Sequence, residues 1–227
     1  MFSSLLNLVY PNLCSLCDEH LTKDENLICN GCYSSLPQTY FWRHKVNPVQ
    51  RNMKARVGVK HGSAFLFFSK NGKVQELLHL IKYHGMTNLA FLLGKYYGEE
   101  LKKSKTLSDV DAIIPVPLHP RKELQRGFNQ SLEICKGLTG ALAIPVWEKV
   151  LLRTSYTTSQ TTKHREERWS NVQQTFKLKK GKTLTGKHVL IVDDVFTTGA
   201  TLEACCQALK LGNPRELSVM TLAYADY

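Results

Sequence analysis

The stretch that most constrains the fold is residues 188–202, which read HVLIVDDVFTTGATL. Four apolar residues in a row, 189–192, predict a parallel strand that helices cover on both faces. Two carboxylates, Asp193 and Asp194, follow where this strand is expected to end. Small and hydroxyl-bearing residues then lead into an amphipathic helix. This order predicts an anion site, because the unpaired N–H groups and the positive end of the helix face the ligand.

The composition of this turn limits the class of ligand that it can bind. It has one glycine, Gly199, and matches neither the Walker A pattern nor the dinucleotide fingerprint. Two acids repel a phosphate unless they bind neutral hydroxyls or a Mg²⁺ ion beside it, as a sugar phosphate would present. The simpler alternative, that Asp194 only complements the helix dipole, explains one residue but not the whole ordered string.

Residues 189–202 resemble the ribose 5-phosphate loop of type I phosphoribosyltransferases, which bind phosphoribosyl pyrophosphate (PRPP) together with Mg²⁺. The resemblance implies that Asp193 and Asp194 hold the ribose hydroxyls. It also implies that the turn wraps the 5-phosphate through Thr197, Thr198, Gly199 and Thr201. The 6-oxopurine salvage enzymes place a base-binding Asp where this chain has Thr197, which argues against that chemistry here.

Two C-x-x-C pairs lie near the N-terminus, Cys14 with Cys17 and Cys29 with Cys32, separated by eleven residues. Four thiolates at this spacing predict a small zinc finger with a structural Zn²⁺. A redox C-x-x-C is the alternative, but it would leave the second pair unexplained. Such a closed site has no open coordination position, so we do not expect catalysis at the metal.

The charge and the hydropathy of the chain limit the classes of protein to which it can belong. The chain of 227 residues carries 30 Lys and Arg against 19 Asp and Glu, a formal net charge of +11. A basic surface favours polyanions such as nucleic acid or phosphorylated molecules. No run approaches the roughly 20 apolar residues of a membrane span. We therefore expect a cytoplasmic protein whose cysteines are thiols or metal ligands.

Residues 36–60 mix aromatic and basic side chains. They form either a surface that stacks single-stranded nucleic acid or a segment that packs the zinc unit onto the main body, and packing is favoured for Trp42. We divide the chain into residues 1–60, comprising an N-terminal helix, the zinc finger and this segment, and residues 61–227, a phosphoribosyltransferase-like domain.

Further cations are candidates for phosphate binding. Lys82 ends a helical pattern at Gly85, where it either complements the helix dipole or reaches a phosphate. Arg126 follows the predicted strand 110–117 in a basic loop, at the end of a strand where ligands bind in open α/β sheets. Arg165 and Arg168 lie in a long polar loop, residues 151–176, which is either a lid over an anion or an ordinary exposed loop.

Strands near residues 110, 189 and 217, separated by helices, predict an α/β fold with a parallel sheet flanked by helices. The four cysteines, LIKYHG at 80–85, VPL at 116–118 with RGFNQ at 126–130, and the TTSQ of 157–160 with Arg165, Arg168 and Asn171 together resemble the ComF (ComFC) family of bacterial competence proteins. That resemblance covers nearly the whole chain. It implies a PRPP-type fold fused to a zinc finger, and a role with the DNA-uptake machinery in handling incoming single-stranded DNA.

Three functions follow from these features. The first is a protein that handles single-stranded DNA and has a PRPP site that regulates or modifies. The second is an enzyme that transfers ribose 5-phosphate from PRPP to a base or an amine, with Arg165, Arg168 and Mg²⁺ stabilising the departing pyrophosphate and the two acids orienting the ribose. The third is a binding module that senses PRPP without turnover.

Overall fold

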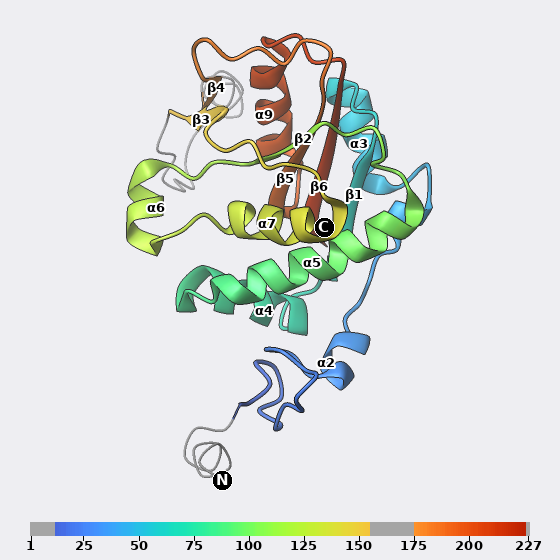
Figure 1. Ribbon diagram of the computed structural model, residues 1–227, viewed down its shortest axis with the longest axis vertical. Helices are drawn as coiled ribbons and strands as arrows, with labels where there is room; N and C mark the ends of the chain where they lie inside the picture. The colour runs from blue at the N-terminus through green and yellow to red at the C-terminus, as the bar shows by residue number, and fades with distance from the viewer. Residues whose placement is uncertain (1–11, 155–174, 226–227) are drawn as a thin grey trace.

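A computed structural model of the protein describes residues 12–154 and 175–225. Figure 1 shows an α/β body with a small N-terminal unit, which carries helix α2 (Asn30–Ser34), at one end of the molecule beyond α4 and α5. None of the helices within residues 12–154 and 175–225 contains an apolar stretch of the length that a membrane span requires.

The body is built on four parallel strands in the order β1-β6-β5-β2, which confirms the predicted parallel sheet. Their bounds are Gly62–Phe68 for β1, Ala112–Pro115 for β2, His188–Phe196 for β5 and Glu216–Ala225 for β6. The apolar run 189–192 is fully buried and lies between β6 and β2. An isolated bridge from Ile113 to Val146 extends the sheet beyond β2.

The two faces of the sheet are covered by different helices (Figure 1). Leu190 and Val192 point into one core, which α4 (Lys73–His84), α5 (Thr87–Ser104) and α7 (Gln130–Leu142) complete. Val189 and Ile191 point into the other, with α3 (Pro48–Val57) and α9 (Ala200–Lys210). Successive side chains of a strand face opposite sides, so an apolar run without alternation requires this double cover.

The expectation that β5 ends at the two acids is wrong. The strand continues to Phe196, and Asp193, Val195 and Phe196 pair with Thr221, Ala223 and Tyr224 of β6. The reason is that the partner strand is long enough to hold this continuation, and the Phe196 ring stacks on Tyr224 at a centroid distance of 5.9 Å. The acids therefore project from a paired strand instead of from a loop.

The predicted helical break is confirmed at Gly85, whose φ of +67° ends α4 before α5 begins. Residues 118–127 were expected to form a loop, but Pro120–Arg126 is a short helix, α6. Proline at its first position and the His119 ring, which accepts from the Arg121 N–H at 3.2 Å, favour this helix. Asn129 caps α7, because its side chain accepts from the Ser131 N–H.

The basic and aromatic segment packs on the body. Its single-turn helix η1 (Phe41–Arg43) buries Trp42 against Phe65 and Tyr97, with centroid distances of 5.7 and 5.5 Å, so packing is confirmed for Trp42. Helix α3, which the sequence did not reveal, places Val49, Met53 and Val57 in the core shared with α9.

Strands β3 (Leu151–Arg153) and β4 (Phe176–Leu178) form a short antiparallel ribbon. They flank the segment predicted as a lid. Arg165 and Arg168 of that segment lie outside the described residues, as do residues 1–11, where the N-terminal helix was expected.

Candidate functional site

The two acids of β5 project at the carboxyl edge of the sheet, where α7 meets them. Asp193 accepts a hydrogen bond from the Ser131 hydroxyl of α7 at 3.0 Å. The same carboxylate oxygen accepts from the backbone N–H of Asp194 at 2.9 Å. These two bonds fix the side chain of Asp193, which is half-buried. Its second carboxylate oxygen accepts no hydrogen bond from the described residues and is free to bind a ligand.

Lys82, one of the candidate phosphate-binding cations of the sequence, lies beside the two acids. It lies in the last turn of α4, and its ammonium is 2.6 Å from Oδ2 of Asp194. Burial raises the pKa of Asp193 to about 7, and the neighbouring Asp194 charge adds to the rise, while the Asp194 N–H, Ser131 and Lys82 act in the opposite direction. The site thus holds two adjacent carboxyl groups and one cation in partly desolvated surroundings.

The turn after β5 offers a row of unpaired donors. Five backbone N–H groups donate to no acceptor among the described residues: those of Thr197, Thr198 and Gly199 in the turn, and those of Thr201 and Leu202 in the first turn of α9. Thr197, Thr198 and Thr201 are exposed, so their hydroxyls are available as well. Unpaired N–H groups at the start of a helix of eleven residues favour an anion.

Gly199 is required at this turn for two reasons. Its φ of +78° lies in the left-handed region, and it caps α9. A Cβ there would also lie 2.9 Å from Cζ of Phe196 and 3.2 Å from Sδ of Met53. The backbone of the turn is therefore pressed against the core, which keeps its donors in place.

Arg56 of α3 fixes the turn from the other side, a contact that the sequence did not predict. Its Nη1 donates to the Thr198 carbonyl at 2.8 Å and lies 3.3 Å from Glu203 of α9. The bond joins residues 142 positions apart, so no local pattern reveals it. The basic character of residues 36–60 was the only signal.

A second group of cations borders the acids. The Arg126 guanidinium lies over the Tyr83 ring at 5.7 Å, and this ring, beside Lys82 in sequence, is 68% exposed. Burial lowers the pKa of Lys122, and Arg153, Arg126 and Lys82 lower it further. Four cations from three elements, α4, α6 and β3, are thus close enough for the other three to lower the pKa of Lys122, an arrangement that a polyanion would relieve.

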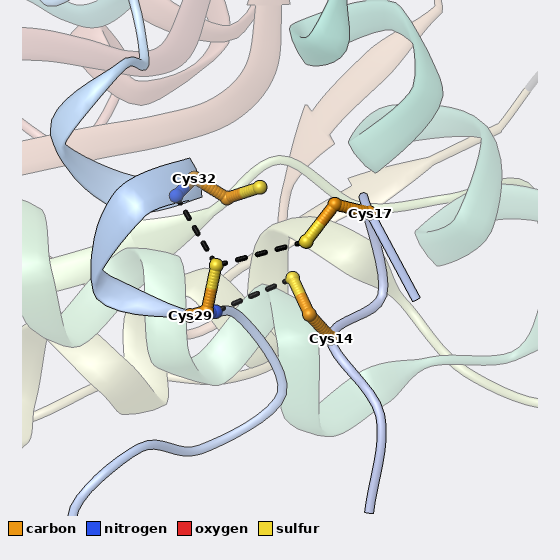
Figure 2. A group of neighbouring side chains, drawn as sticks. All are labelled: Cys14, Cys17, Cys29 and Cys32. Carbon is orange, nitrogen blue, oxygen red and sulfur yellow. Dashed lines mark hydrogen bonds between the residues drawn. The ribbon is translucent and has the colours of Figure 1, made fainter. Parts of the chain in front are cut away.

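The four N-terminal cysteines converge (Figure 2). Their sulfur atoms all lie within 4.8 Å of one another, and only Cys17 among them is exposed. Tetrahedral zinc with bonds of about 2.3 Å needs sulfurs about 3.8 Å apart, so this set fits the ion. Burial opposes ionisation of Cys14, but the N–H donors of Cys29, Leu16 and Cys17 outweigh it and lower its pKa to about 7. The fold thus helps the first thiolate to form.

Comparisons with known proteins agree with this architecture. The family model of the phosphoribosyl transferase domain matches residues 140–226. Competence protein ComFC of Streptococcus pneumoniae is 29% identical over 97% of this chain and 92% of its own length. DNA utilization protein YhgH of Escherichia coli K12 is 28% identical over 90% of this chain and 86% of its own.

Among solved structures, the glutamine PRPP amidotransferase of Bacillus subtilis matches with a TM-score of 0.40 and 21% identity, over 57% of this chain and 26% of that one. The phosphoribosyltransferase-like fold class and the resemblance to competence proteins that the sequence predicted are confirmed.

Proposed function

We propose, from the premise that this chain is homologous to the ComF-type competence proteins and carries a phosphoribosyltransferase domain, that it binds PRPP or a related ribose phosphate and handles single-stranded DNA during DNA uptake. The single observation that carries the proposal is that a turn with unpaired N–H donors follows closely after two carboxylates in the last part of β5. Either feature alone is common. Together they match a ligand with a phosphate at one end and hydroxyls at the other.

In this assignment the 5-phosphate lies on the turn and receives bonds from the N–H groups and hydroxyls of Thr197, Thr198, Gly199 and Thr201. Asp193 and Asp194 accept from the ribose hydroxyls, which are neutral and do not repel them. The carboxylate oxygens are also the ligand type that Mg²⁺ prefers, so the acids fit a Mg²⁺ ion carried by PRPP. Lys82 balances one of the two charges and adds a cation for the pyrophosphate.

The DNA role rests on the cations beside this site. The exposed Tyr83 ring and the Arg126 guanidinium form a flat surface on which a base can stack, and Lys122 and Arg153 supply charge for the backbone. The net charge of +11 supports binding to a polyanion. A strand bound here would place its bases next to the proposed ribose phosphate.

A transferase is the alternative, and the acid pair is the observation that favours it. Transfer breaks the bond between the anomeric carbon and pyrophosphate and forms one from that carbon to an incoming base or amine. Asp193 and Asp194 would orient the ribose, and Arg165 and Arg168, outside the described residues, would stabilise the departing pyrophosphate. If PRPP binds but does not react with a base or an amine, the same site serves as a sensor of PRPP.

The zinc finger is proposed as a structural module within the N-terminal part of the chain, residues 1–60, beside a phosphoribosyltransferase-like domain of residues 61–227, in a cytoplasmic protein. Cys14, Cys17, Cys29 and Cys32 would provide four thiolates and close the coordination sphere. The metal then stabilises a unit that has few buried apolar residues of its own.

Two measurements on the purified, zinc-loaded protein separate these functions. Release of pyrophosphate from PRPP is followed with Mg²⁺, with and without single-stranded DNA or candidate bases; steady release identifies a transferase. A mobility shift of single-stranded DNA across salt concentrations tests the DNA role, which requires affinity that falls steeply as salt rises. Asp193→Asn with Asp194→Asn is the reference variant, expected to lose PRPP and to keep its zinc. Retained PRPP affinity in that variant would contradict the assignment of the acids.

A further inference from the structure

A cavity of about 720 Å³ lies at the opposite edge of the sheet from Asp193 and Thr197. It is enclosed by η1 and the residues after it, by the first residues of β1, and by the turn that follows α5. Its volume falls within the range of small-molecule sites, which runs from roughly 300 to 1,000 Å³. Neither the acids of β5 nor the turn 197–201 lines it, so it is separate from the proposed ribose phosphate site.

The lining is strongly basic. It contains four cations, Arg43, Lys45, Lys60 and Lys105, and one carboxylate, Asp109. Lys60 lies 2.7 Å from Asp109 and lowers its pKa to about 2, so this acid is ionised and already compensated. Arg43 is 3.3 Å from Glu100 at the rim. The side chains of Lys45 and Lys105 have no ion-pair partner among the described residues, and both are exposed.

Two buried side chains of the lining, Trp42 and Ser63, have a polar atom without a hydrogen-bond partner among the described residues. Trp42 is 4% exposed, and its indole N–H has no hydrogen-bond partner in the part of the chain that the structure describes. A buried N–H without an acceptor costs about 1 to 3 kcal/mol, so such groups usually have a partner. Trp42 lines the cavity beside Phe41. Its N–H has almost no accessible surface, so the indole has to turn slightly for an acceptor on a bound molecule to reach it.

Hydrolytic chemistry at this edge is excluded by burial. His188 lies 2.8 Å from the Ser218 hydroxyl and 3.1 Å from Asp109, distances that resemble a Ser-His-Asp triad. Both Ser218 and His188 are 0% exposed, so no substrate can reach the hydroxyl. The network instead holds the first residues of β5 and β6 together, and Asp109 belongs to it. The cavity is therefore suited to binding without reaction.

We propose that this cavity binds one nucleoside monophosphate unit. The phosphate lies between the free ammonium groups of Lys45 and Lys105, and the base lies against the aromatic floor, where a carbonyl or ring nitrogen accepts from the Trp42 N–H. The cavity has room for one such unit, and it is partly open to solvent, so a strand can continue from it on the open side. The unit is either a free nucleotide or the terminal 5′-nucleotide of a single strand. The proposal does not depend on PRPP binding at the other edge.

The experiment is a calorimetric titration of the zinc-loaded protein with dTMP, repeated in saturating PRPP and Mg²⁺. The test variant is Lys45→Glu with Lys105→Glu, and its matched control, Lys179→Glu with Lys180→Glu, changes the same charge on exposed lysines after β4. We expect one dTMP per chain, affinity about tenfold lower in the test variant, and affinity within about twofold in the control, as for loss of a charge-assisted contact. PRPP should not displace dTMP.

Two further variants test the proposal if Lys45→Glu with Lys105→Glu does not fold. Trp42→Phe removes the N–H and keeps the ring, and it should weaken dTMP several-fold. Asp193→Asn with Asp194→Asn should lose PRPP and keep dTMP, which distinguishes failure of this proposal from failure of the proposed function. An equal loss in both lysine pairs, displacement by PRPP, or no binding by the unaltered protein would overturn the proposal.

The source of the nucleotide is read from a third arm, in which (dT)₈ with and without a 5′-phosphate replaces dTMP. A preference for the phosphorylated oligonucleotide that Lys45→Glu with Lys105→Glu abolishes identifies a strand end. Binding of dTMP without such a preference identifies a free nucleotide. Either result supports the site.

Discussion

The ammonium of Lys82 lies 2.6 Å from Oδ2 of Asp194, so the last turn of α4 neutralises one of the two adjacent acids of β5. The contact links a helix on one face of the sheet to the edge where the turn 197–201 begins. It is partly buried, with 23% and 16% of the two side chains exposed, and so it is screened less than a surface pair. A removed cation would leave two adjacent carboxyl groups without compensation.

Lys82→Met is therefore expected to lower the affinity for PRPP with Mg²⁺ about tenfold at neutral pH, because the Asp193 pKa rises further once this cation is gone. Part of the loss should be regained at a pH about two units higher, where Asp193 ionises again. Calorimetric titration at both pH values checks this, with Lys70→Met, an exposed lysine of the turn before α4, as control. A loss equal at both pH values would show that Lys82 does not act through the acids.

The raised pKa of Asp193 also predicts how stability depends on pH. Burial lifts it from 3.8 in the unfolded chain to about 7, so folding takes up a proton on this group. Its contribution to stability is then fully present below the unfolded pKa and is lost as pH rises through the folded one. We expect the free energy of unfolding of the native protein, minus that of Asp193→Asn, to fall between about pH 4 and pH 7, the interval between the unfolded and the folded pKa.

Urea unfolding of both proteins without Mg²⁺ at several pH values measures this difference, and the titrations of all other groups cancel in it. A difference that stays constant would place Asp193 in contact with solvent and would remove the desolvation assigned to it.

Gly199→Ala tests whether the backbone of the turn needs its close contact with Phe196 and Met53 in the core. Gly181 has a similar φ, +80°, but nothing lies within 4 Å of where its Cβ would be. Gly181→Ala should cost only backbone strain, about 1 to 2 kcal/mol. Gly199→Ala adds the contacts with Phe196 and Met53, so it should destabilise more and should also weaken PRPP binding. Thermal unfolding of both variants makes the comparison, and equal losses would show that the turn has room to move.

Cys29→Ser is expected to release the zinc ion and unfold the N-terminal unit, because a serine hydroxyl does not replace a thiolate ligand. Cys206→Ala is the control, since Cys206 is a buried thiol of α9 far from the cluster in sequence. Metal analysis should find about one zinc per chain in the native protein and the control, and much less in Cys29→Ser. Full zinc content in Cys29→Ser would contradict a site of four thiolates.

Sequence patterns predicted the features that depend on neighbouring residues. The apolar run 189–192 required a covered parallel strand, Gly85 ended a helix, and the cysteine spacing placed four sulfurs together. These depend on local geometry and periodicity, which a chain displays directly.

The missed features depend on partners distant in sequence. Strand β5 continues past Asp193 because β6 is long enough to pair with it. Helix α3 is mostly polar outside its buried face, and it is held by packing on β1 and α9. Arg56 reaches Thr198 only once that packing exists. For the site, the acids and the turn were evident from the sequence, whereas the contacts of Lys82, Ser131 and Arg126 required the fold.

The most direct test of the ribose phosphate site is a crystal structure of the zinc-loaded protein soaked with PRPP and Mg²⁺. We predict the 5-phosphate on the backbone N–H groups of residues 197–202 and the ribose hydroxyls within hydrogen-bond distance of Asp193 and Asp194. Density for the ligand at another place, or a turn left empty at saturating PRPP, would contradict the assignment.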